Sequence, residues 1–340
     1  METTEPCFDV AQLAHVELLT PRPDESLWFF RDILGMQVSA QEGQSVYLRG
    51  FEEYCHHSLK LTEAPEAGMG HCAWRTSSAP ALQRRADAID ASGFGDGWID
   101  GDVGHGRAYT FHTPDGHKME LVWDVDRAVV PTELTTRLQN RPQRRPLTAA
   151  PVRRIDHVNV MCRDLDSVAE VGKFMRDTMG FRLREVFLGP DGKGIRGEWL
   201  SVSALVHEIA IMGDGLGASG RLHHLCFWYG TQQHLEDLVD VCNDHRIFVE
   251  LGPAVHGITR AKCLYVREPG GNRIELFGDT GYLILDPDWE APVWSDDDLE
   301  IAGAWVGTPE FTPDWFMYGT PVLDPASIST PTEQDSPTHA

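Results

Sequence analysis

Two histidines and one glutamate in the second half of the chain have residue types that can hold a metal ion. His157, His224 and Glu275 lie in three separate apolar runs, each typical of a β-strand. One sheet can bring strands that are distant in sequence together and place the three side chains on one concave face. Two imidazoles and one carboxylate, with the opposite positions left to water, dioxygen or substrate, suit non-heme Fe(II) and, less often, Mn(II).

A structural role for these residues has to be weighed against the metal site. A single histidine in a strand is more often a hydrogen-bonded residue of the core or the rim than a ligand. Glu275, however, lies between Ile274 and Leu276 at an inward position, where a lone carboxylate is costly to bury without a cation. The combination therefore favours a metal site.

An internal repeat indicates which elements position these residues. In each half an apolar strand that begins at a histidine is followed by a helix with aromatic residues on its periodic face, and a glycine ends the helix, at Gly35 or Gly180. A second match is a Pro-Gly turn that leads into a strand bearing Glu120 or Glu275. The matching stretches are His15–Leu19 with His157–Met161, Phe29–Met36 with Phe174–Phe181, and Pro114–Leu121 with Pro269–Leu276.

The repeat predicts an α+β fold of two tandem modules, each built from two βαβββ motifs that form a cup-shaped mixed sheet. Short alternating runs between the matching stretches supply the remaining strands. The predicted divisions are an N-terminal module at 8–125, a linker at 126–151 with one helical turn, a metal-binding module at 152–290, a C-terminal extension at 291–323 and a mobile tail at 324–340.

Composition excludes several classes of partner. The chain has 340 residues with 52 acidic and 29 basic side chains, a formal charge of −23, which disfavours a nucleic-acid surface. It has neither an apolar run long enough for a membrane span nor the features of a secretory signal at its start, so we expect a cytoplasmic protein. Seven scattered cysteines without a Cys-x-x-Cys pair are expected to be reduced.

Five stretches of the second half together resemble a known enzyme family. The chain is similar, over roughly residues 10 to 295, to the type I extradiol catechol dioxygenases of the vicinal oxygen chelate superfamily, which share a glyoxalase-like fold. The stretches that carry the resemblance are Arg154–Asn159, Val206–Ala210, Leu222–Phe227, Gly252–Gly257 and Tyr265–Phe277.

The resemblance implies a role for each matching residue. The metal ligands are His157, Glu275 and the second histidine of the pair, His224, whereas His223 is interpreted as a solvent-side or packing residue. His207 matches the acid–base histidine that takes a proton from the catechol and later returns one. The remaining matches are His256 and Tyr265, which hydrogen-bond the catechol oxygens, and Asn159 and Trp199, which lie around the site.

The family also implies cofactor, substrates and product. We expect Fe(II), with Mn(II) as an alternative, a catechol and O2 as substrates, and a muconic semialdehyde-type product of aromatic catabolism. The family further implies a homo-oligomer, a dimer or a tetramer. Two places where relatives bind a substrate carboxylate with arginine are Leu251 and Ala302 here, which favours a catechol without a carboxylate at that point.

The first half retains His15, His71 and Glu120 at the places that match the three ligands. His56 or His57 and His105 also have counterparts, whereas Thr110 stands where Tyr265 falls in the second half. In the family this module usually lacks metal, so the chemistry is assigned to the second half. A second, vestigial metal site at His15, His71 and Glu120 remains an alternative.

Paired modules of this kind also build proteins with other functions. The alternatives are a 4-hydroxyphenylpyruvate-type oxygenase, a glyoxalase-like isomerase and a metal-free sequestering protein. The chemistry of the first does not call for His207, His256 and Tyr265, and a glyoxalase completes its metal site differently. A sequestering protein needs no ligands at all, so extradiol cleavage is favoured.

Overall fold

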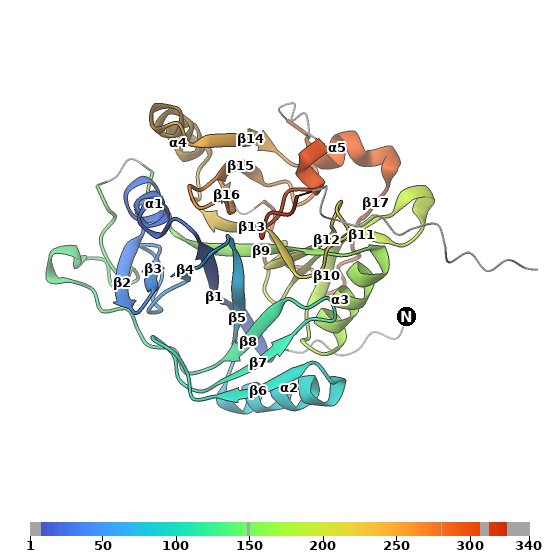
Figure 1. The fold of residues 1–340 in the computed structure, drawn as a ribbon, viewed down its shortest axis with the longest axis horizontal. Helices are drawn as coiled ribbons and strands as arrows, with labels where there is room; N and C mark the ends of the chain where they lie inside the picture. Colours follow the sequence, from blue (N-terminus) through green and yellow to red (C-terminus); the bar gives the residue numbers. More distant parts are fainter. Residues whose placement is uncertain (1–7, 148–149, 280, 307–312, 325–340) are drawn as a thin grey trace, which may run out of the picture.

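The computed structural model describes residues 8–147, 150–279, 281–306 and 313–324. Two large sheets meet at the centre of the molecule, and helices lie at the periphery (Figure 1). The strands of the first sheet are β1 (Val10–Thr20), β2 (Gln37–Glu42), β3 (Ser45–Arg49), β4 (Leu59–Glu63), β5 (Gly68–Thr76), β6 (Gly95–Ile99), β7 (Ala108–His112) and β8 (Lys118–Val122). The strands of the second are β9 (Arg154–Cys162), β10 (Arg182–Leu188), β11 (Ile195–Ser201), β12 (Ile209–Gly213), β13 (Arg221–Trp228), β14 (Phe248–Val255), β15 (Lys262–Arg267), β16 (Arg273–Phe277) and β17 (Val293–Trp294).

The helices follow the predicted repeat. The α-helices are α1 (Pro23–Trp28), α2 (Ala79–Ser92), α3 (Leu165–Asp177), α4 (Gln232–His245) and α5 (Leu299–Gly303). The short helical turns are η1 (Phe29–Ile33), η2 (Thr132–Leu134), η3 (Pro190–Gly192), η4 (Asp296–Asp298) and η5 (Pro313–Phe316). Gly35 and Gly180 follow the helices with positive φ angles of 68° and 81°, a conformation that glycine adopts without steric cost.

Each sheet joins two strand-helix-three-strand units through their first strands. The first sheet has the order β2-β3-β4-β1-β5-β8-β7-β6, in which β1 pairs with β4 in parallel and with β5 antiparallel. The second sheet repeats this arrangement as β14-β15-β16-β13-β9-β12-β11-β10 and adds β17 at its edge. The predicted α+β fold of paired βαβββ motifs is therefore confirmed, and β17 is an addition from the C-terminal extension that the repeat did not predict.

The core is continuous between the two halves. Two pairs of aromatic rings join one module to the other. The ring centroids of Phe30 and Phe227 are 6.2 Å apart, and those of Trp74 and Phe181 are 4.9 Å apart. All four side chains are buried. Because apolar burial is the main source of folding free energy, the modules support each other.

Two further expectations concern segments outside the sheets. The turn η2 lies in the predicted linker, as expected. Residues 325–340 of the predicted tail lie outside the described residues. Across the part of the chain that the structure describes, no helix has both the length and the apolar composition needed to cross a membrane.

Candidate active site

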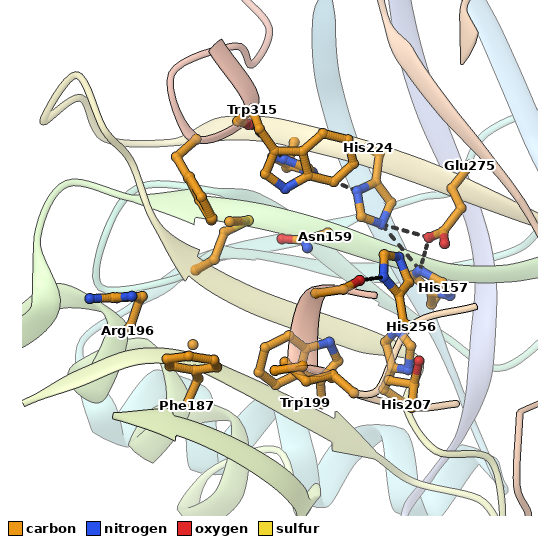
Figure 2. Close-up of a pocket in the computed structure, with 18 of the residues that line it drawn as sticks. His157, Asn159, Phe187, Arg196, Trp199, His207, His224, His256, Glu275 and Trp315 are labelled. Atoms are coloured by element: carbon orange, nitrogen blue, oxygen red, sulfur yellow. Dashed lines mark hydrogen bonds and ion pairs between the residues drawn. The ribbon is translucent and has the colours of Figure 1, made fainter. Parts of the chain in front are cut away.

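Three neighbouring strands of the second sheet carry the predicted ligands. His157 lies on β9, His224 on β13 and Glu275 on β16, and β13 pairs with both other strands. The three side chains are almost fully buried, with exposures of 1%, 3% and 1%. Figure 2 shows them converging at one end of a pocket. The structure thus brings the predicted ligands together.

The distances between the three donor atoms fit a metal ion. Nε2 of His157 is 3.2 Å from Nε2 of His224 and 2.9 Å from Oε2 of Glu275, and the third distance, from His224 to Glu275, is 3.0 Å. In octahedral coordination, two neighbouring donor atoms form a right angle at the ion. If each is about 2.1 Å from the ion, the two donors lie about 3.0 Å apart. The arrangement therefore matches one face of an octahedral site.

The second oxygen of Glu275 supports the same assignment. Oε1 is buried and has no hydrogen-bond partner among the described residues. Burial alone would raise the pKa of Glu275, but His224 and His157 outweigh it and hold the pKa well below its usual range. A buried, ionised carboxylate with an unpartnered oxygen is the form that binds a divalent cation.

Hydrogen bonds on the far side of the ligand rings orient His157 and His224. Nδ1 of His157 is 3.1 Å from Oδ2 of Asp156, the carboxylate partner typical of metal-bound histidines. Nδ1 of His224 is 2.6 Å from Nδ1 of His223, whose Nε2 is 3.1 Å from the carbonyl oxygen of Trp315. Because a carbonyl only accepts, neutral His223 donates from Nε2 and accepts at Nδ1 from His224, which leaves the lone pair of His224 Nε2 for a metal.

The solvent-side interpretation of His223 is wrong. His223 is 1% exposed and lines the pocket, because the C-terminal extension covers this part of β13. We predict that His223→Leu weakens metal binding by roughly 10- to 100-fold, since the hydrogen bond that orients His224 is lost. Metal titration of the chelator-treated variant measures this, and unchanged affinity would contradict the orienting role.

His207 lies beside the ligands, as the sequence predicts. It follows β11, is 4% exposed, and its ring centroid is 4.0 Å from that of His157. Nδ1 has no hydrogen-bond partner among the described residues. Burial, then the neighbouring His157, lowers the pKa of His207 well below its ordinary value. The ring is therefore neutral and able to accept a proton.

The buried carboxyl of the next residue, Glu208, should make the stability of the folded chain depend on pH. It is 3% exposed and accepts a 2.9 Å hydrogen bond from the Val202 amide, and burial raises its pKa to about 7. The folded chain thus favours neutral Glu208, a contribution that is complete below pH about 4.5 and lost as pH rises through about 7. Glutamine stays neutral at every pH. We therefore expect the free energy of unfolding of Glu208→Gln, relative to that of the unsubstituted chain, to increase by roughly 1–3 kcal/mol from pH 5 to pH 8. Denaturant unfolding at both pH values measures the difference, and a pH-independent difference would contradict it.

His256 and Tyr265 form a hydrogen-bonded chain at the site. Nδ1 of His256 is 2.6 Å from the carbonyl oxygen of Gly303 in α5, so it donates to that carbonyl. The other ring nitrogen, Nε2, accepts from the Tyr265 hydroxyl at 3.0 Å. Burial, then the nearby Glu275, raises the pKa of Tyr265 well above its usual value, so the phenol stays protonated. The phenol oxygen keeps lone pairs for a hydrogen bond from a ligand.

The pocket extends from the three ligands toward Phe187 and Arg196 (Figure 2). Asn159 and Trp199, both predicted, line it, and Oδ1 of Asn159 is buried without a hydrogen-bond partner among the described residues. The C-terminal extension forms one wall, a role that no sequence pattern indicated. The pocket residues that the sequence analysis missed are Phe187, Arg196, Gly197, Met212, Ile258, Thr259, Phe277, Leu299, Gly303, Trp315 and Phe316.

Ala302 and Leu251, the two positions where relatives have an arginine, lie in different surroundings. Ala302 lines the pocket, whereas Leu251 is packed in a core cluster with Tyr265 and Trp315 and is not among the pocket-lining residues. Arg196 does line the pocket, but it forms a 2.9 Å ion pair with Asp296 and lies 5.3 Å from the Phe187 ring centroid. Its charge is therefore already paired.

Comparison with known proteins agrees with the fold and identifies the family. The model of the Glyoxalase/Bleomycin resistance protein/Dioxygenase superfamily matches residues 12–121 and 154–276. The metapyrocatechase of Geobacillus stearothermophilus is 54% identical over 94% of this chain and 96% of its own. The manganese-dependent 2,3-dihydroxybiphenyl 1,2-dioxygenase of Geobacillus genomosp. 3 is 37% identical over 90% of this chain and 96% of its own.

Among solved structures, homoprotocatechuate 2,3-dioxygenase from Brevibacterium fuscum in complex with 3,4-dihydroxyphenylacetate is similar with a TM-score of 0.80. It is 28% identical, and the match covers 95% of this chain and 97% of the other. The chain belongs to the Glyoxalase/Bleomycin resistance protein/Dioxygenase superfamily and, within it, to the extradiol dioxygenases. It is thus an oxidoreductase, which places it outside the isomerases and sequestering proteins considered above.

Proposed function

We propose that the chain cleaves the ring of a catechol beside its two hydroxyls, using O2 and a metal ion held by His157, His224 and Glu275. The observation that carries the proposal is the convergence of these three donors at one end of an apolar pocket that also presents His207, His256 and Tyr265. The resemblance of the whole chain to a metapyrocatechase supports it.

The three ligands suit Fe(II), with Mn(II) as the alternative, because both ions accept two imidazoles and a carboxylate. When bound, such an ion holds catechol and O2 next to each other and carries electrons between them. Activity after reconstitution of the metal-free protein with each ion separately distinguishes the two. The higher kcat/KM is expected with Fe(II).

The surrounding residues handle the proton and orient the diol. Neutral His207 can take one hydroxyl proton from the catechol and hold it on its ring until the ring-opened product needs it. The Tyr265 oxygen, with its hydrogen directed at His256, can accept a hydrogen bond from the other hydroxyl. The unpartnered Oδ1 of Asn159, two residues from His157 on the same face of β9, offers another contact to the substrate.

The shape and charge of the pocket favour a catechol that is unsubstituted or has an apolar substituent. Its walls away from the ligands are largely aromatic and aliphatic, including Phe187, Trp199 and Ile258. Among the described residues, the single arginine on the lining, Arg196, is paired with Asp296, and Ala302 provides no positive charge. A carboxylate buried there would lack a partner, which is costly.

A substrate panel tests this preference. We expect kcat/KM for catechol and 4-methylcatechol to exceed that for homoprotocatechuate by at least about tenfold, as measured by O2 uptake and the yellow product. A preference for homoprotocatechuate would overturn the assignment of the pocket. Absence of O2 uptake with every catechol, by the Fe(II)-loaded protein, would overturn the proposed function itself.

We also propose that the protein is a cytoplasmic homo-oligomer, a dimer or a tetramer, as expected for this family. Exposed apolar side chains in the C-terminal region, such as Leu285 and Trp305 with exposures of 79% and 67%, support self-association. Size-exclusion chromatography with light scattering measures the subunit count, and a monomer would contradict this part of the proposal.

A further inference from the structure

The first module contains a buried group of histidines around a carboxylate that the catalytic chemistry does not use. His15 lies on β1, Glu120 on β8, and His105 in the loop between β6 and β7. Their exposures are 4%, 4% and 8%, and one possible ligand atom from each lies within 4.8 Å of the others. His71 on β5 adds a fourth side chain, with its Nε2 2.9 Å from Nε2 of His15.

The hydrogen bonds of His105 leave two acceptors facing each other. Nδ1 of His105 is 2.9 Å from the carbonyl oxygen of Gly106 and must donate to it. In its neutral form the ring therefore presents the lone pair of Nε2 to Oε1 of Glu120, 3.4 Å away. That oxygen is buried and has no hydrogen-bond partner among the described residues. A cation between the two atoms would relieve this unfavourable contact.

His71 is held in the same way. Its Nδ1 is 3.0 Å from Oε2 of Glu17, so the ring donates to that carboxylate and turns the lone pair of Nε2 toward His15. Histidines that bind metals typically donate their second nitrogen to a carboxylate or a backbone carbonyl. The Gly106 carbonyl does this for His105, as Asp156 does for His157 in the catalytic module, and Glu17 fixes His71 beside His15.

We propose that His15, His105 and Glu120 bind a second divalent cation, Zn²⁺, with a water molecule as the fourth ligand. The distances from Oε1 of Glu120 to Nε2 of His105 and of His15 are 3.4 and 3.8 Å. Donors at tetrahedral positions around Zn²⁺ lie about 3.4 Å apart, wider than the spacing of the catalytic ligands. Three protein ligands, with water in the fourth position, would join β1 and β8 to the loop before β7 and stabilise the module.

This site differs from the predicted vestigial one in its ligands. The sequence pairs His15 and His71 with Glu120, but the group of three whose donors lie mutually within 4.8 Å contains His105 in place of His71. The proposed second site therefore depends on His105 and Glu120 rather than on His71.

Zn²⁺ binding by the full-length Glu275→Ala variant tests the proposal, because this variant lacks a ligand of the catalytic metal. The result thus does not depend on the proposed function. After chelation and gel filtration we expect calorimetry and metal analysis to give one Zn²⁺ per chain, with a rise in Tm. Adding His105→Gln should weaken binding at least about tenfold and abolish the rise in Tm.

His112→Gln in the same background is the matched control, since His112 pairs with Asp96 on the surface of the same module. This control should bind Zn²⁺ as the Glu275→Ala variant does. Absence of stoichiometric Zn²⁺ binding by the Glu275→Ala variant, or equal binding after His105→Gln, would overturn the proposal. If His105→Gln prevents folding, Co²⁺ substitution of the Glu275→Ala variant decides, because only a tetrahedral site gives intense visible absorption.

Discussion

Replacing Glu275 by alanine should remove the metal from the second module and abolish ring cleavage. Glu275 is the only carboxylate among the three converging donors, and its Oε2 lies 2.9 and 3.0 Å from Nε2 of His157 and His224. Without it, two imidazoles remain, and they bind Fe(II) or Mn(II) much less strongly than a site that includes an anionic oxygen. We expect metal affinity to fall by more than about 100-fold, because even residues behind the ligands contribute 10- to 100-fold.

Metal titration of chelator-treated protein measures this affinity, and O2 uptake with catechol measures the turnover. Glu236→Ala is the control, because Glu236 is an exposed glutamate on α4 and does not line the pocket. It should keep the metal and the turnover. Turnover that survives Glu275→Ala would assign the chemistry to another part of the chain.

The arrangement of the ligands could be predicted because they lie at equivalent points of a repeat. His157 lies in the first strand of its half as His15 does, and Glu275 follows a Pro-Gly turn as Glu120 does. Each βαβββ unit pairs its strands in the same order, so matching residues reach matching places in each sheet. The one expected difference between the halves, threonine in place of tyrosine, falls at matching places in the two sheets. Thr110 lies opposite Glu120 in the first sheet, and Tyr265 lies opposite Glu275 in the second.

The wall formed by the C-terminal extension could not be predicted, because this segment has no counterpart in the first half. Trp315 and Phe316 reach the pocket through long-range packing, and His256 is oriented by a backbone carbonyl, that of Gly303. A carbonyl acceptor has no residue type that a sequence pattern could reveal. The same segment explains the error about His223, whose Nε2 finds the Trp315 carbonyl instead of water.

Strand alternation would also misplace His223. It places successive side chains on opposite faces of a sheet. In β13, however, the pairing with β9 shifts register between Leu222 and His224, and both faces of the strand are covered. Adjacent His223 and His224 can therefore both contribute to the pocket.

Replacing His207 by phenylalanine should leave the metal bound and remove most of the turnover. His207 contacts the ring of His157, but its Nδ1 has no partner among the described residues, so it is available for proton transfer. Phenylalanine retains a planar ring in the same space and cannot carry a proton. General acid–base catalysis typically contributes 10²- to 10⁴-fold, so we expect kcat to fall by roughly 100-fold or more.

Three measurements separate this role from a structural one. Metal content and anaerobic catechol binding should remain close to those of the unsubstituted chain, because the ligands and Tyr265 are unchanged. His207→Asn should be as inactive as the phenylalanine variant, since an amide does not titrate near neutrality either. A variant that loses metal together with turnover would show that His207 supports the ligands instead of moving the proton. Because His207 is neutral before catechol binds, that proton comes from the substrate, and its return to the opened ring is the step that should become slow.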